Sequence, residues 1–231
     1  SMADGSDFID WTDQITDYYS LSDKNWMSGI SGERRINEIN IPGTHDSSMK
    51  RTESRFSASV GDFMHMHYMA QTQYLYINEQ LNAGARLFDI RVNNMHLVPS
   101  HDANIWERLM AAEWGILTWS GGTVYDLEDD GENLWTCHGK DKVGGTFYAM
   151  KSNGDDQSVD DVLNWMTNFL IMHPTETLIV GFQAETQDDD EENVRITNER
   201  MYQKLYALSQ KIRKSFAAGF KAANLLTVSS E

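Results

Sequence analysis

Short apolar segments alternate with helix-like segments along this chain, and this alternation constrains the fold more than any other feature. Residues 85–92 read ARLFDIRV and residues 177–182 read TLIVGF, both bounded by turn or polar residues. Runs of this length and composition predict buried strands. Helices between buried strands favour a parallel sheet covered by helices, with functional side chains at the C-terminal ends of the strands.

The helices of this pattern have recognisable ends. Apolar residues at helical spacing predict a helix over residues 68–82, with Gly84 in the position of a left-handed C-terminal cap. A second amphipathic helix over residues 159–170 begins after Ser158, which is a good N-cap, and ends before Pro174.

Two further strands and a long helix complete the expected elements. Residues 36–41 predict a short strand that ends at a turn, and residues 134–138 predict another after a long intervening segment. The acidic residues 188–192 precede a helix, and this placement favours a helix-start role over a cation site. The apolar stripe of that helix consists of Met201, Leu205, Leu208, Ile212 and Phe216.

Composition limits the class of protein. A chain of 231 residues with 40% hydrophobic residues can bury a sizeable core, and it lies near the lower end of what a full α/β barrel needs. The net charge of −16 repels a polyanion, so nucleic acid is not an expected partner. The single cysteine, Cys137, excludes an internal disulfide, and no apolar run reaches the length of a membrane span. The first residues lack the character of a signal peptide, which leaves open a leader that has been removed.

Four sequence blocks carry a family resemblance. They are IPGTHDS at residues 41–47, LNAGARLFDIR at 81–91, CHG at 137–139 and HPTETLIV at 173–180. In this order they resemble the X domain of bacterial-type phosphatidylinositol-specific phospholipase C, over roughly residues 36 to 187. The resemblance implies a (β/α) barrel of which only the N-terminal half to two-thirds is present.

The expected organisation combines this resemblance with the polar and aromatic character of the first residues. Residues 1–33 are interpreted as a helical lead-in, and residues 34–231 as the catalytic domain with an insertion at residues 94–133. The barrel of the family continues through further strands. The missing half is therefore expected from the rest of a longer chain or from a second copy, because an open sheet edge is normally covered.

The resemblance also implies a reaction. In this family the inositol 2-hydroxyl attacks phosphorus, expels diacylglycerol and leaves a cyclic inositol phosphate. Such a reaction needs a base and an acid, and two imidazoles suit these roles. His45 matches the base and His138 the acid, while Arg91 matches the group that stabilises the phosphoryl oxygens. Asp46 and Asp89 match the carboxylates that orient them.

Three residues are candidates for substrate contacts: Gln183, Glu185 and Lys140. Gln183 stands where the bacterial family usually has lysine, which leaves the identity of the substrate open. No cofactor is expected.

No metal is expected either. The calcium-dependent relatives carry an acid where Arg91 stands, so the resemblance implies that Arg91 takes the place of the metal. Residues 126–131 are similar to the opening of an EF-hand loop, but the twelfth position is Cys137 instead of glutamate, which disfavours a calcium site.

The expected partners are a phospholipid or inositol phosphodiester and, transiently, a membrane surface, in a secreted or cell-surface protein. The tryptophans of the insertion, Trp106, Trp114 and Trp119, predict either a flap beside the cleft or simple packing. Two other functions stay open. One is a metal-dependent glycerophosphodiesterase or sphingomyelinase-like enzyme, and the other is a catalytically inactive binding module.

Overall fold

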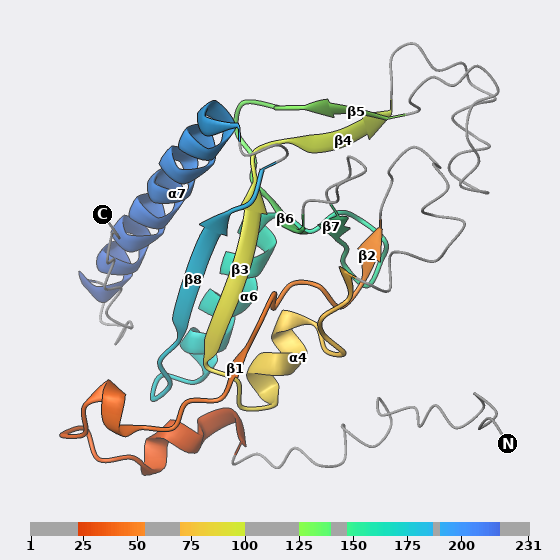
Figure 1. Ribbon diagram of the computed structural model, residues 1–231. Helices are drawn as coiled ribbons and strands as arrows, with labels where there is room; N and C mark the ends of the chain where they lie inside the picture. Colours follow the sequence, from red (N-terminus) through yellow and green to blue (C-terminus); the bar gives the residue numbers. More distant parts are fainter. Residues whose placement is uncertain (1–22, 54–69, 100–124, 140–146, 187–189, 218–231) are drawn as a thin grey trace, which may run out of the picture.

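The computed structural model describes residues 23–53, 70–99, 125–139, 147–186 and 190–217 (Figure 1). A curved sheet forms its centre, and β3 (Leu87–Asn93) runs parallel to both β1 (Gly43–Thr44) and β8 (Ile179–Ala184). The sheet continues through β6 (Trp135–His138), β7 (Phe147–Ala149) and β2 (Thr52–Glu53). The expected α/β fold, with part of a barrel present, is confirmed.

The expectation of an entirely parallel sheet is wrong at β6. This strand is antiparallel to β3, with Val92 opposite Thr136 and Asn93 opposite Trp135, and it is also antiparallel to β7. A parallel connection needs a crossover segment, usually a helix. The described parts of the 94–133 insertion instead form an antiparallel ribbon of β4 (His96–Pro99) and β5 (Tyr125–Glu128). This ribbon turns the chain back toward β3. Trp106, Trp114 and Trp119 lie outside the described residues.

The helices largely follow the sequence pattern. Helix α6 (Val159–Met172) begins where predicted, and the Ser158 hydroxyl accepts a hydrogen bond from the backbone of Asp161 at 3.1 Å. Helix α7 (Glu191–Ala217) follows Asp190, whose side chain accepts a hydrogen bond from the backbone N–H of Glu192 at 2.9 Å. This contact supports the helix-start interpretation of the acidic run. Helix α4 (Ile77–Asn82) is shorter than the predicted segment, since residues 71–76 are not helical.

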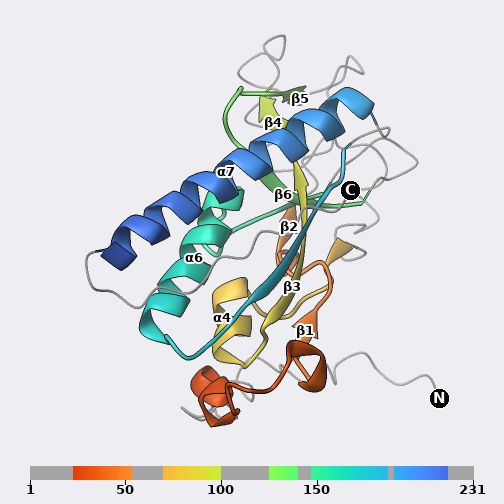
Figure 2. The same cartoon turned by 90° about the vertical axis from the view of Figure 1, so that its left-hand side faces the viewer.

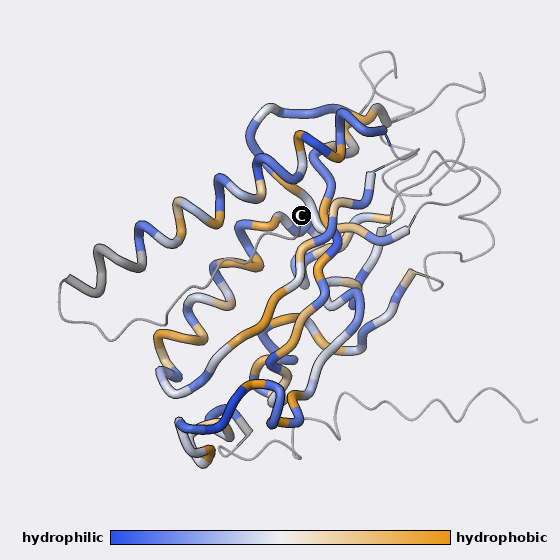
Figure 3. The backbone as a smooth tube through the Cα atoms, turned by 60° about the vertical axis from the view of Figure 1, so that its left-hand side comes forward, coloured by the Kyte–Doolittle hydropathy of each residue, from blue (hydrophilic) through white to orange (hydrophobic). Residues whose placement is uncertain are grey.

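The core lies between the central strands and the helices. Phe88, Ile90 and Val92 alternate along β3 and are at most 1% exposed, and they pack with α6 residues such as Val162 and Met166. Helices α6 and α7 lie on the same side of β3 and β8 (Figure 2). Apolar residues are concentrated along these strands and on α6, whereas α7 alternates between polar and apolar positions (Figure 3). The other face of β3 is left for polar side chains.

The predicted strand over residues 36–41 is wrong. Residues Ile36–Glu38 form the 3-10 turn η2, and the Glu38 carboxylate accepts a hydrogen bond from the backbone N–H of Arg35 at 3.1 Å. Within residues 36–44, the strand pairing with β3 is limited to Gly43 and Thr44. A side chain at Gly43 would bring its Cβ within 2.9 Å of Leu87, so glycine permits this close approach.

The described end of the lead-in, η1 (Asp23–Gly29), packs against the turn that leads into β3. The indole N–H of Trp26 donates to the carbonyl of Gly84 at 2.9 Å, and Arg86 donates to the carbonyl of Lys24 at 3.0 Å. Arg86 is fully buried and also pairs with Glu176 at 2.8 Å. The described part of the lead-in is therefore bound to the residues that directly precede β3.

No helix within the described residues has both the length and the apolar character needed to cross a bilayer.

Candidate active site

The turn after β1 places His45 and Asp46 against β3. Asp46 has a left-handed backbone with φ 45°, which aspartate tolerates better than most residues. The hydroxyl of Thr72 donates to the carbonyl of Asp46 at 2.9 Å. Ser47 and Asp89 exchange two hydrogen bonds, from Ser47 N to Asp89 O at 2.8 Å and from Asp89 N to Ser47 Oγ at 3.0 Å. The turn is therefore fixed to the middle of β3.

Asp46 is the centre of the polar cluster. Its Oδ2 lies 2.9 Å from Nδ1 of His45 and 3.2 Å from Nδ1 of His138, and its Oδ1 lies 3.3 Å from Nε of Arg91. The Asp46 side chain is 1% exposed, whereas that of His45 is 70% exposed. One buried carboxylate thus holds two imidazoles and a guanidinium together.

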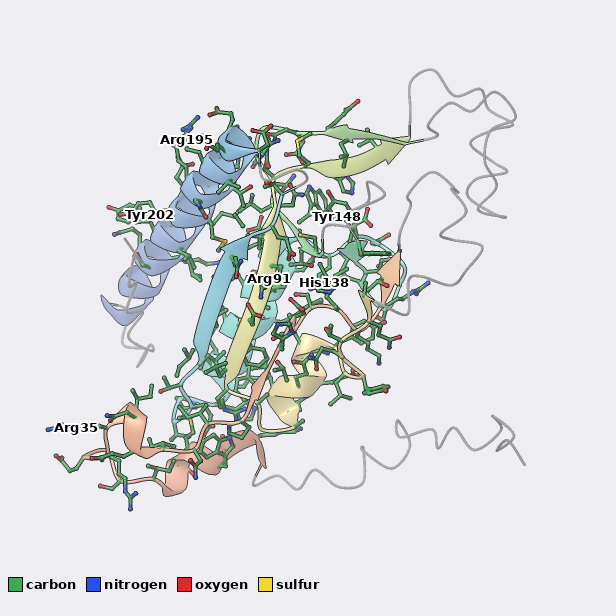
Figure 4. The ribbon with its side chains drawn as sticks, in the orientation of Figure 1. Arg35, Arg91, His138, Tyr148, Arg195 and Tyr202 are labelled. Atoms are coloured by element: carbon green, nitrogen blue, oxygen red, sulfur yellow. The ribbon has the colours of Figure 1, made fainter. Side chains whose placement is uncertain are left out.

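Arg91 is fixed by a second carboxylate. Its Nε and Nη2 donate to Oδ2 of Asp89 at 3.3 and 3.1 Å. Burial opposes the charge of Arg91, but the hydrogen bond to Asp89 and the charges of Asp89, Asp46 and Glu185 outweigh it, so the pKa of Arg91 is raised above its usual value. Arg91 and His138 lie on the face of the sheet turned to the viewer in Figure 4.

The sequence pattern predicted that Asp89 and Arg91 lie at the C-terminal end of their strand. In the structure both lie within β3. The alternation of a strand explains their accessibility, because residues two apart share one face. That face points away from the apolar core. His138 does end its strand, β6, but reaches the cluster from an antiparallel direction.

The three expected substrate contacts have different positions. Gln183 is opposite Arg91 in the pairing of β3 with β8, and it is exposed. Glu185 follows β8, and one of its ligand atoms lies within 4.8 Å of ligand atoms of Asp46 and His138. Lys140 lies outside the described residues.

The residues that support the turn were missed in the sequence. Ser47 and Thr72 hold the backbone, and the amide of Gln73 donates to the carbonyl of His45. Ser47 stands in the IPGTHDS block, so its position was a signal. Thr72 and Gln73 lie in a segment predicted to be helical, and nothing in their spacing indicates this role.

Cys137, which precedes His138 in β6, is buried. Burial raises the pKa of the Cys137 thiol well above its usual value, and the charges of Glu185 and Asp46 add to this effect. The thiol therefore stays protonated and behaves as a small packing residue. Its Sγ lies 3.5 Å from the carbonyl of Glu185.

The EF-hand-like stretch at residues 126–131 makes contacts with α7 and within its own turn. The Asp129 carboxylate accepts two hydrogen bonds from Arg200 of α7, at 2.6 and 2.8 Å, and one from the amide of Asn94 at 2.9 Å. The carboxylate of Asp130 accepts hydrogen bonds within the turn itself, from the backbone N–H groups of Glu132 and Asn133. The Asp129 contacts thus tie the first half of α7 to the turn that follows β5.

The fold and the polar cluster are those of an α/β protein with a two-histidine, one-arginine site, and the resemblance seen in the sequence is confirmed by comparison. No protein-family model matches the chain. The chain is similar to proteins named 1-phosphatidylinositol phosphodiesterase. That of Listeria monocytogenes is 29% identical over 177 residues, which are 77% of this chain and 38% of the relative. That of Staphylococcus aureus strain Newman is 37% identical over 76 residues, which are 33% of this chain and 22% of the relative.

The chain thus spans less than two-fifths of the length of these relatives. Among solved structures, one concerning the membrane binding of the Staphylococcus aureus phosphatidylinositol-specific phospholipase C has a TM-score of 0.41 at 20% identity, covering 73% of this chain and 38% of the other. A second structure, of a pentafluoro-Phe form of the same enzyme, has a TM-score of 0.43 at 21% identity, covering 81% and 46%.

Proposed function

We propose that the chain carries the catalytic half of a phosphodiesterase that cleaves phosphatidylinositol, or a related inositol phosphodiester, to a cyclic inositol phosphate and diacylglycerol. The observation that carries the proposal is the contact of His45, His138 and Arg91 with the single carboxylate of Asp46. A base, an acid and a phosphate-binding cation within one cluster are what this phosphoryl transfer requires. The names of the relatives support the substrate class.

The two histidines share the proton transfers. With the proton of His45 on Nδ1, 2.9 Å from the Asp46 carboxylate, Nε2 has a free lone pair and accepts the proton of the inositol 2-hydroxyl. That oxygen attacks phosphorus, and the bond from phosphorus to the diacylglycerol oxygen breaks. His138, oriented by the same carboxylate through Nδ1, donates the proton on Nε2 to the leaving oxygen. The products are the cyclic phosphate and neutral diacylglycerol.

Arg91 acts on the phosphoryl group. The hydrogen bonds from Nε and Nη2 to Asp89 fix the plane of the guanidinium. A fixed, permanently charged group can stabilise the negative charge that develops on the phosphoryl oxygens without rearranging. Asp46 and Asp89 are positioning residues in this scheme. Gln183, Glu185 and Lys140 are proposed to contact the rest of the substrate.

One observation favours the metal-dependent alternative. His45, Asp46 and Asp89 each offer a ligand atom, and these atoms lie within 4.8 Å of one another. Against it, the guanidinium of Arg91 lies 3.3 Å from Asp46 and 3.1 Å from Asp89, which opposes a cation between these carboxylates. Activity that survives excess EDTA supports the metal-free scheme, and activity that EDTA abolishes and calcium or magnesium restores supports the alternative.

The proposal extends to the setting of the enzyme. We expect a secreted or cell-surface protein that acts transiently at a membrane surface, with residues 34–231 as the catalytic domain. Among the described strands, β8 pairs only with β3, so its other edge can receive a further strand. The rest of the barrel then comes from a longer chain or from a second copy.

A direct assay tests the function. Purified protein is mixed with phosphatidylinositol vesicles in EDTA, and cyclic inositol phosphate is followed by phosphorus NMR. His45→Ala and His138→Ala are each expected to lower turnover by roughly 10²- to 10⁴-fold. His96→Asn is the matched control, because His96 pairs with Asp156 outside the cluster. Absence of product with the folded wild-type protein would support the inactive binding module instead.

A further inference from the structure

Asp46, His138 and Glu185 form a second group of possible ligands at the polar cluster. Asp46 follows β1, His138 ends β6 and Glu185 follows β8, so three separate elements contribute. One ligand atom of each lies within 4.8 Å of the other two. The contact between His138 Nδ1 and Asp46 Oδ2 measures 3.2 Å.

Several polar atoms of this group find no hydrogen-bond partner among the described residues. They are both carboxylate oxygens of Asp46, Nδ1 of His138 and Oε2 of Glu185, all buried, although Asp46 lies within ion-pair distance of its neighbours. Asp46 is 2% exposed. Nearly all buried polar atoms in proteins have a partner, and an orphaned one costs about 1–3 kcal/mol. Several such atoms in one place indicate a site for a cation, which accepts lone pairs from oxygen and nitrogen atoms.

We infer that Asp46, His138 and Glu185 form a binding site for a divalent transition-metal ion of the zinc type, and that the ion inhibits the enzyme. Two carboxylate oxygens and one imidazole nitrogen make a three-ligand set that zinc accepts with a fourth, open position. Calcium prefers six to eight oxygen ligands, so the imidazole argues against it.

The alternative set of His45, Asp46 and Asp89 is less suited to an ion. Oδ2 of Asp89 already accepts two hydrogen bonds from Arg91, at 3.3 and 3.1 Å. His45 is also the most exposed member of the cluster, at 70%. In the inferred site Asp46 uses Oδ2 for the ion while its Oδ1 keeps the contact with Arg91 at 3.3 Å. The positive charge of Arg91 limits the affinity.

The ion is expected to inhibit because it competes with a proton for Nδ1 of His138. This step rests on the proposed function. A histidine that acts as general acid must carry protons on both ring nitrogens before it gives one away. An ion on Nδ1 of His138 occupies the position of one of these protons. The ring then cannot become an imidazolium, and the N–H that stays on Nε2 is a much weaker acid toward the leaving oxygen.

Direct metal binding tests the site without reference to activity. Zinc is titrated into the purified wild-type protein by calorimetry, and cobalt is titrated while its visible absorption is recorded. Glu185→Gln is expected to weaken zinc binding by roughly 10- to 100-fold or more, because it removes a ligand but keeps the shape. Asp156→Asn is the matched control, since Asp156 forms the other His–Asp pair, with His96 at 2.6 Å, away from the cluster. Equal zinc affinity in the wild type and in Glu185→Gln would overturn the inference.

A second measurement follows zinc binding in the wild-type protein and needs a variant only for resonance assignment. In protein with ¹⁵N-labelled histidine, zinc is expected to shift the Nδ1 resonance of His138, assigned from its loss in His138→Gln. An unshifted His138 resonance at saturating zinc would equally overturn the site.

The activity assay separates the two proposals. Zinc is expected to inhibit the wild type at a concentration roughly 10- to 100-fold lower than the one that inhibits Glu185→Gln. A wild type that binds zinc through Glu185 but has no phosphodiesterase activity would leave the metal site standing and reject the proposed function. An active wild type that zinc does not inhibit would reject the inhibitory site alone.

Discussion

Oδ2 of Asp46 lies between two histidines, 2.9 Å from Nδ1 of His45 and 3.2 Å from Nδ1 of His138. In the proposed mechanism these histidines have opposite roles, one accepting and one donating a proton. A single carboxylate that orients both couples the base to the acid, and its position therefore decides whether either ring faces the substrate correctly.

The first prediction concerns Asp46. Replacing it by asparagine keeps the size but removes the charge and offers an amide that can turn an imidazole to the wrong tautomer. We expect turnover to fall by about 10³-fold or more, with a smaller change in KM, because the loss falls on proton transfer. Steady-state kinetics on phosphatidylinositol vesicles measures both. Asp156→Asn is the control, and a loss of less than about tenfold in Asp46→Asn would contradict the shared role.

The second prediction concerns Arg91. Lysine at this position keeps the charge but loses the planar arrangement of N–H donors held by Asp89, so turnover is expected to fall by roughly 10²-fold. Arg195→Lys, at an exposed position on α7, is expected to leave turnover unchanged. Near-normal turnover in Arg91→Lys would mean that charge alone is sufficient. In the metal-free scheme EDTA does not change the result for either protein.

The third prediction concerns stability at the opposite end of the sheet. Arg86 and Glu176 are fully buried side chains that pair at 2.8 Å, so Arg86→Met leaves the Glu176 carboxylate without its partner. We expect the free energy of unfolding to fall by about 3–5 kcal/mol, measured by urea denaturation. Arg195→Met removes an exposed ion pair with Glu192, and because solvent screens such a pair the free energy of unfolding is expected to stay nearly unchanged. Replacing both Arg86 and Glu176 by apolar residues should recover part of the loss.

The fourth prediction concerns the pH dependence of stability through Asp129. Burial works against its charge, but the hydrogen bonds from Arg200, Asn94 and the backbone of Gly131 outweigh it, so the pKa of Asp129 is lowered in the folded protein. A lowered pKa contributes stability that is present above the unfolded value, about pH 4, and is lost as the pH falls through the folded value. Asp129→Asn is therefore expected to destabilise the protein by about 1 kcal/mol at pH 7, and by progressively less as the pH falls below about 4. Thermal unfolding across this range measures it, and a destabilisation that does not change with pH would contradict the ionic origin.

The sequence by itself determined the elements whose signals are local. Helix α6 begins at the predicted cap because the Ser158 hydroxyl can satisfy a backbone N–H wherever that helix forms. The alternation of Phe88, Ile90 and Val92 with Asp89 and Arg91 likewise fixes which side chains share a face of β3. Short motifs also indicated His45, Asp46 and His138 as candidates.

Only the tertiary structure decided the direction of β6 and the convergence of the cluster on one carboxylate. Strand direction depends on how the intervening chain returns, and the β4–β5 ribbon replaced the crossover that a repeated strand–helix pattern predicts. The contact of His138 with Asp46, and the placement of Glu185 beside both, join residues far apart in the chain. Such contacts depend on packing of the whole sheet, because no spacing within a single segment encodes the distance between side chains on different strands.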